Sequence, residues 1–185
     1  AEEAQKNNMK VTIVSSDKDL MQLVSDNVSM LDTMKGRVFK KADVFDKFGV
    51  YPDKVIDVQS LAGDSVDNIP GIPGIGIKTA ALLINEYGDL DGLFENSEKI
   101  KQKKRRENII EFENQAYISK KLVTLKNDVP LPIPIKETSL KEIDAEKLIS
   151  FLKEMEFKTL TEKKSKQLNI NSDNKLGIRV NYLPH

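Results

Sequence analysis

Four aspartates in two short segments are the residues of this sequence whose types and spacing suit chemistry. Asp17 and Asp19 lie in Ser-Ser-Asp-Lys-Asp-Leu, and Asp64 and Asp67 lie in Gly-Asp-Ser-Val-Asp-Asn. Carboxylates are the ligands that hard divalent cations such as Mg²⁺ and Mn²⁺ prefer. Four converging carboxylates would repel one another unless cations lay between them. Two such ions about 3.5–4 Å apart hydrolyse phosphodiesters in other proteins. The pairs therefore predict a two-metal hydrolytic site.

The second acidic pair runs directly into a glycine-rich loop, Ile-Pro-Gly-Ile-Pro-Gly-Ile-Gly-Ile-Lys-Thr-Ala. Gly71, Gly74 and Gly76 permit unusual backbone conformations and a close approach to a ligand. Lys78 and Thr79 fall in the first turn of the helix that follows, and amides at a helix start bind phosphate. The loop predicts a contact with a nucleic-acid backbone that does not read base identity. A purely structural turn is the alternative.

A basic run offers a further candidate contact with nucleic acid. It consists of Lys101, Lys103, Lys104, Arg105 and Arg106. The run lies at the start of a predicted helix, 100–112. Each phosphate that such a cation neutralises releases counterions, so binding would be sensitive to salt. A solvated helix face without any ligand is the alternative.

The elements that must position these residues fall into three predicted parts. Residues 1–50 are a small α/β part, with strands predicted over 10–15, which is rich in β-branched residues, and over 28–31 and 37–40. Asp17 and Asp19 follow the first strand, at the sheet edge where ligands bind in open α/β folds. Two or three strands make a poor parallel sheet, so we expect further strands upstream of residue 1.

The second part, residues 51–168, reads as helical, and residues 169–185 read as a linker or tail. Helices are predicted over 53–61, 77–87, 90–94, 100–112, 115–125, 145–155 and 159–168. A structured loop is predicted over 63–75, where a helical turn would place Asp64 and Asp67 on one face.

Composition excludes several other classes of protein. Cysteine is absent and the only histidine is His185, so disulfides, thiolate metal sites and imidazole catalysis are excluded. The 29 basic residues balance the 29 acidic ones, so any attraction to nucleic acid must come from the distribution of charge. No apolar run approaches the roughly 18 residues of a membrane span, and no signal peptide is recognisable. We expect a cytoplasmic protein without a membrane partner.

Two alternative interpretations of the aspartates remain open. Asp17 is suited to capping a helix that begins near Lys18, and Asp67 to fixing the turn before Pro70. A phosphoacceptor receiver domain also places an aspartate at a strand end. That fold needs five alternating strands and helices, which the helical second half does not supply.

Three segments resemble the 5′-nuclease domain of bacterial DNA polymerase I, within the flap-endonuclease superfamily. They are residues 15–20, 61–71 and 74–80, and the resemblance extends over about residues 1–165. It implies a PIN-like α/β nuclease core, of which this chain holds the C-terminal part, followed by a helical subdomain with a helix–hairpin–helix-like motif. It also implies that the family's other acidic ligands precede residue 1, so we expect this fragment alone to bind metal weakly and to cleave poorly or not at all.

The resemblance implies a function and a set of site residues. The function is a structure-selective 5′→3′ exonuclease and flap endonuclease that removes primers and displaced 5′ strands in replication and repair. The intact domain would bind two Mg²⁺ or Mn²⁺ ions, and the ligands from this chain, mostly to the second of these ions, would be Asp17, Asp19, Asp64 and Asp67. The glycine loop would bind the duplex and a K⁺ ion. The implied partners are double-stranded or flap DNA and the rest of the polymerase in cis, in a monomer. The alternative is a non-catalytic duplex-binding helix–hairpin–helix module.

Overall fold

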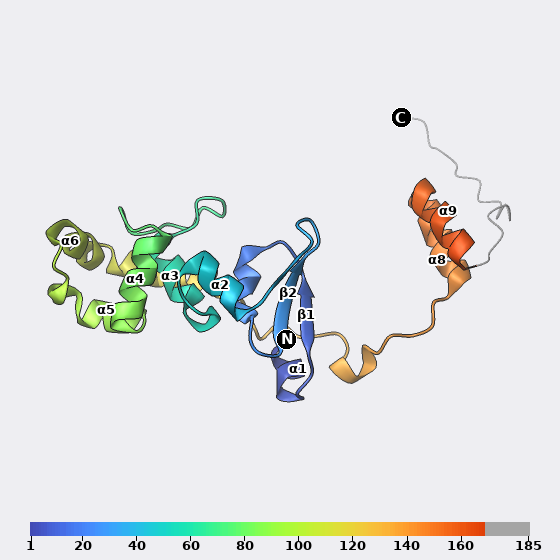
Figure 1. The fold of residues 1–185 in the computed structure, drawn as a ribbon, viewed down its shortest axis with the longest axis horizontal. Helices are drawn as coiled ribbons and strands as arrows, with labels where there is room; N and C mark the ends of the chain where they lie inside the picture. The colour runs from blue at the N-terminus through green and yellow to red at the C-terminus, as the bar shows by residue number, and fades with distance from the viewer. Residues whose placement is uncertain (169–185) are drawn as a thin grey trace. The chain divides into compact units, whose positions relative to one another are not determined.

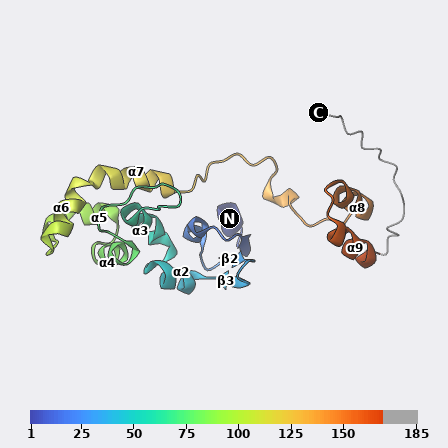
Figure 2. The same ribbon diagram turned by 90° about the horizontal axis from the view of Figure 1, so that it is seen from above.

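The structure is a computed structural model that describes residues 1–168. The chain divides into two compact units, Ala1–Ile135 and Lys136–His185, and only the first part of the second unit, 136–168, is described. Figures 1 and 2 show the helices and strands of each unit. The predicted tail, 169–185, lies outside the described residues.

The first unit begins with the α/β part that the sequence predicts. Its elements are α1 (Glu2–Lys6), β1 (Val11–Val14), the 3₁₀ helix η1 (Lys18–Leu23), β2 (Val28–Asp32), β3 (Arg37–Phe39) and α2 (Lys41–Phe48). The sheet has the order β1-β2-β3, in which β1 and β2 are parallel and β3 is antiparallel to β2. Val28 and Met30 of β2 are fully buried, as expected for an apolar strand in the middle of a small sheet.

The rest of the first unit is helical. Its elements are η2 (Pro52–Lys54), α3 (Val55–Ala62), α4 (Ile77–Tyr87), α5 (Leu90–Glu95), η3 (Ser97–Lys99), α6 (Lys103–Glu111) and α7 (Glu113–Val123). The prediction placed the start of α6 at residue 100, but the helix begins at Lys103, so Lys101 precedes it. Residues 125–134 form no regular helix or strand, because alternate prolines there favour extended backbone.

Helix α3 lies at the centre of the first unit and packs against α4 and α7. Val55, Val58 and Leu61 have no exposed surface. The buried Asp57 is paired with Lys120 Nζ of α7 at 3.0 Å, which compensates for the burial of its charge. A rigid α3 matters for the site, because the acidic loop begins where this helix ends.

One continuous core joins the α/β part to the helical part. Met30 and Phe48 from the first belong to the same cluster of buried side chains as Val58 and Leu83 from the second. The division at residue 50 between an α/β part and a helical part stays a prediction, and the two parts share this core.

The second unit contains a helical hairpin, α8 (Ala145–Glu154) and α9 (Lys158–Gln167), after the short 3₁₀ turn η4 (Ile135–Glu137). Asp144 caps α8, because its side chain accepts a hydrogen bond from the Lys147 amide at 3.0 Å. Ile149 and Leu152 are buried between the two helices. Among the described helices, none is long and apolar enough to span a membrane.

Candidate metal centre and duplex-binding loop

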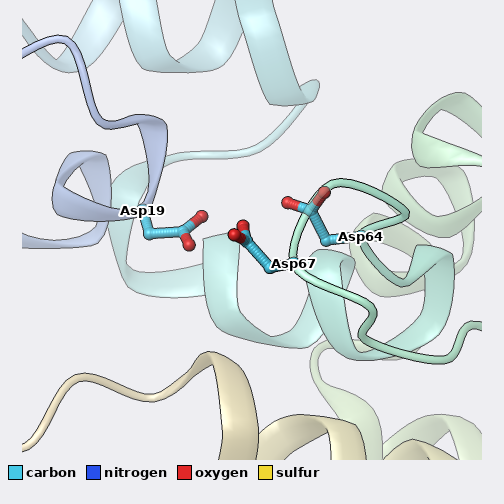
Figure 3. Close-up of side chains that lie close together, drawn as sticks. All are labelled: Asp19, Asp64 and Asp67. Carbon is cyan, nitrogen blue, oxygen red and sulfur yellow. The ribbon is translucent and has the colours of Figure 1, made fainter.

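Three of the four predicted aspartates meet in the structure. Asp19, Asp64 and Asp67 each offer a carboxylate oxygen, and these three oxygens lie within 4.8 Å of one another (Figure 3). Asp19 belongs to η1, and the other two belong to the loop after α3. Three converging carboxylates are a donor set that fits a hard divalent cation with several oxygen ligands.

The loop that carries Asp64 and Asp67 is closed by its own backbone. The Asp64 amide donates to the Ile69 carbonyl at 2.9 Å, and the Ile69 amide donates back at 2.8 Å. Asn68 adopts a left-handed conformation, φ 56°. The two carboxylates therefore converge through a tight loop, as expected for 63–75, and not through a helical turn.

Asp64 is held as an anion. It is 7% exposed, and its carboxylate is paired with Lys18 Nζ and accepts the Val66 amide at 3.0 Å. The hydrogen bond from Lys18 lowers the pKa of Asp64, and the Val66 amide lowers it further, although burial acts in the opposite direction. The same contact raises the pKa of Lys18. An ionised carboxylate is the form that a metal ion requires.

Asp17 lies outside this group of three. Its Oδ1 accepts the Asp19 amide at 3.0 Å, which makes Asp17 the N-cap of η1. Its own amide donates to Ser15 Oγ at 3.1 Å. The geometry matches the capping alternative, so a role for Asp17 as a metal ligand stays a prediction.

Lysines near the acidic group were not anticipated from the sequence. Lys18 contacts Asp64 directly. Burial lowers the pKa of Lys47 of α2, and the nearby charges of Lys35 and Lys18 lower it further, while Asp19 acts in the opposite direction. Lys18 and Lys47 lie far apart in the sequence, so no local charge run marks them.

The glycines near the loop serve two different purposes. Gly63 and Gly71 lie against each other: a Cβ on Gly71 would come within 2.2 Å of the Ala62 carbonyl oxygen. By contrast, a Cβ on Gly76 would meet nothing within 4 Å, and one on Gly74 would only just reach Asn108. Gly63 and Gly71 are therefore required for packing. Gly74 has a φ of 77°, a conformation that favours glycine, and both Gly74 and Gly76 face open space where a ligand has room to approach.

The loop and the start of α4 present the predicted phosphate contacts. Gly76 is the N-cap of α4, Lys78 is exposed, and Thr79 is partly exposed. Within the described part of the chain, no hydrogen bond or ion pair engages the Lys78 ammonium. These residues stay predictions as DNA contacts, and their placement at an exposed helix start is compatible with that role.

Three side chains from α6 and α7 hold the carbonyls of this loop, and sequence reasoning missed them. Ser119 Oγ donates to the Pro70 carbonyl at 2.5 Å, Gln115 Nε2 to Gly71 at 2.8 Å, and Asn108 Nδ2 to Pro73 at 2.7 Å. Asn108 and Ser119 are buried. The one sequence signal for these three residues is that each is a polar residue on the face of an amphipathic helix that is expected to be buried.

Asn108→Ala is expected to loosen the loop around Pro73. The variant removes the donor of a partly buried hydrogen bond to the exposed Pro73, so the free energy of unfolding should fall by about 0.5–1.5 kcal/mol. Thermal unfolding followed by circular dichroism measures this. Asn114→Ala, on the exposed part of α7, is the control and should leave the midpoint unchanged; equal midpoints for both variants would contradict the anchoring role.

The basic run is divided by its contacts. Arg106 is half-buried; its Nη1 donates to the Ile100 carbonyl at 2.9 Å, so it fastens the start of α6. Lys103 is 3.8 Å from Glu107. Across residues 1–168, no hydrogen bond or ion pair engages the side chains of Lys101, Lys104 and Arg105. A contact with DNA stays a prediction for all five, and Arg106 has a structural role in addition.

Comparison with known families assigns both parts of the first unit. Residues 1–49 match the 5′-3′ exonuclease N-terminal resolvase-like domain, and residues 50–146 match the 5′-3′ exonuclease C-terminal SAM fold. The chain belongs to the 5′-3′ exonuclease family. This confirms the resemblance and the fold class predicted from the acidic and glycine-rich segments.

Similar curated proteins include DNA polymerase I and free-standing exonucleases. DNA polymerase I of Rhizobium leguminosarum is 55% identical over 161 residues, which cover 87% of this chain and 16% of that protein. The 5′-3′ exonuclease of Aquifex aeolicus is 40% identical over 86% of this chain and 54% of its own length. The chain thus spans about half of the exonuclease and less than a fifth of the polymerase.

Solved structures of a phage exonuclease share the fold. Zinc-bound T5 5′-exonuclease has a TM-score of 0.58 and 28% identity, covering 62% of this chain and 42% of that one. T5 D15 protein co-crystallised with metal ions has a TM-score of 0.60 and 25% identity, covering 65% and 46%. Both neighbours are described as metal-bound, which agrees with the donor set formed by Asp19, Asp64 and Asp67.

Proposed function

We propose that this chain is part of a structure-selective 5′→3′ exonuclease and flap endonuclease that acts on DNA. The observation that carries the proposal is the convergence of Asp19, Asp64 and Asp67 within 4.8 Å, next to an exposed glycine loop at a helix start. Membership of the 5′-3′ exonuclease family supports it. The similarity to DNA polymerase I supports a place in primer removal and repair, fused in cis to a polymerase, in the bacterial cytoplasm.

The residues of the chain divide the work between chemistry and positioning. Asp19, Asp64 and Asp67, with Asp17 as a further candidate, would hold Mg²⁺ or Mn²⁺. When bound, such ions activate water and neutralise the charge that develops on the phosphate. The loop amides beyond Gly74, together with Lys78 and the cations near α6, would bind the duplex backbone and keep it near the acidic group. We propose K⁺ at the loop and a monomeric state as well.

The competing function is a duplex-binding module without metal. One observation favours it: both Asp17 and Asp64 have a structural role. Asp17 is the N-cap of η1, and the side chain of Asp64 accepts a hydrogen bond from the Val66 amide in its own turn. Direct titration separates the two functions. We expect the chain to take up Mn²⁺ saturably, measured by calorimetry, and to bind a fluorescent 5′-flap duplex more tightly than the single strand, with affinity that falls as salt rises. Duplex binding without Mn²⁺ uptake would favour the module and contradict the nuclease.

A further inference from the structure

Gln59 makes the contact that joins α3 to the acidic group. The side chain is 3% exposed, and its Nε2 donates to Asp19 Oδ1 at 2.6 Å, across 40 residues of sequence. Asp19 lies in η1, whereas Gln59 lies one turn before the end of α3. A bond to an ionised carboxylate is shorter and stronger than a neutral one. The helix at the centre of the unit thus fixes the orientation of a carboxylate on a short peripheral element.

The other end of the same amide is unsatisfied. Gln59 Oε1 is buried, and no donor among the described residues reaches it. Leaving a buried acceptor without a partner lowers the free energy of unfolding, and an apolar side chain of similar shape would avoid that penalty. Packing alone therefore does not account for a glutamine here. Its Nε2 donor toward Asp19 is the property that a methionine or leucine would lack.

The bond also makes the two carboxylate oxygens of Asp19 different, because only one of them accepts it. Gln59 engages Oδ1, and within residues 1–168 no donor engages Oδ2, which leaves that oxygen for a cation. Asp64 differs, because Lys18 engages its Oδ2 and the Val66 amide donates to its Oδ1, so both oxygens of that carboxylate are held. Partners that orient metal-binding carboxylates typically contribute roughly 10–100-fold to metal affinity.

From these contacts we infer that Gln59 is a positioning residue that orients Asp19 toward the divalent ion. This inference rests on the proposed function, because it requires a metal at the acidic group. It adds a residue that lies outside the acidic and glycine-rich segments. Gln59 acts through Asp19 and does not itself contact the ion.

Gln59→Met tests the inference by Mn²⁺ titration calorimetry on the whole chain. Methionine keeps the length of the side chain and removes the donor, so Mn²⁺ affinity should fall about tenfold. The unfolding midpoint should change little, because the loss of the bond to Asp19 and the removal of the orphaned acceptor act in opposite directions. If Gln59→Met lowers the unfolding midpoint, the Mn²⁺ titration is made with Gln59→Leu, which also lacks the donor.

Gln22→Met is the matched control. Gln22 also lies in η1 and fastens it to α7, donating to the Val123 carbonyl at 3.0 Å. If general loosening of η1 were responsible, this variant would weaken Mn²⁺ binding as much as Gln59→Met does, and the inference would be overturned. We expect instead a lower unfolding midpoint and unchanged Mn²⁺ affinity.

A double-variant cycle completes the test. In an Asp19→Asn background, Gln59→Met should cause no further loss of Mn²⁺ affinity, because the positioned carboxylate is already gone. Additive losses would overturn the inference. If the wild-type chain takes up no Mn²⁺, the proposed metal centre fails and the inference falls with it. If wild type binds and Gln59→Met binds equally, only the inference fails.

Discussion

Asp64→Asn combined with Asp67→Asn is expected to remove saturable Mn²⁺ binding from this chain. The two changes take away two of the three converging carboxylates and keep their shape. Partners that merely orient a ligand contribute about 10–100-fold to metal affinity, so the loss of two ligands should exceed roughly 100-fold. Titration calorimetry with Mn²⁺ measures the change directly. The carboxamide introduced by Asp64→Asn keeps an oxygen that can accept the Val66 amide, so the loop should stay closed.

A second pair of substitutions separates this effect from a change in net charge. Asp53→Asn with Asp128→Asn alters the charge equally, at exposed carboxylates outside the acidic group. We expect wild-type Mn²⁺ affinity from this control. Binding to flap duplex without metal should not weaken in the variant of Asp64 and Asp67, because fewer negative charges face the phosphates. Undiminished Mn²⁺ uptake by that variant would end the case for a metal centre at this loop.

Local patterns predicted most of the elements, because each carries its own signal. The strands predicted over 10–15, which is rich in β-branched residues, and over 28–31 form the parallel pair. Gly49 ends α2 in a left-handed conformation, φ 73°, which is common for a glycine that follows a helix. The convergence of Asp19 with Asp64 and Asp67 was anticipated from residue types, since carboxylates that follow a strand and precede a phosphate-binding loop suggest one site.

The missing contacts are those that only the tertiary structure creates. Nothing near Gln59 in the sequence indicates that its amide meets Asp19, 40 residues away. The contact from Ser119 to Pro70 spans 49 residues. Arg106 looked equivalent to its basic neighbours, but the direction of its side chain, toward the Ile100 carbonyl, is set by the turn before α6. Periodicity predicts which face of a helix is buried, but not which polar group it meets.

Gly71→Ala is expected to destabilise the fold strongly. The new Cβ would lie 2.2 Å from the Ala62 carbonyl oxygen and 2.8 Å from the Gly63 nitrogen. Both obstacles are backbone atoms at the end of α3, so neither can turn away as a side chain would. Overpacking typically costs about 1–3 kcal/mol, and an obstacle made of backbone places this site at the upper end. The midpoint of thermal unfolding should fall by roughly 6–12 °C.

Gly76→Ala supplies the contrast within the same loop. Its φ of −92° suits alanine, and the added Cβ meets nothing within 4 Å. Alanine is a poorer N-cap than glycine, so we expect the free energy of unfolding to fall by only about 1 kcal/mol or less. If phosphate approaches the amides at the start of α4, the added methyl group should reduce affinity for a 5′-flap duplex roughly tenfold. Fluorescence anisotropy at fixed salt measures this loss. A stable Gly76→Ala chain that binds duplex like wild type would show that the open glycine faces solvent only, and the duplex contact would then have to lie elsewhere, at the cations near α6.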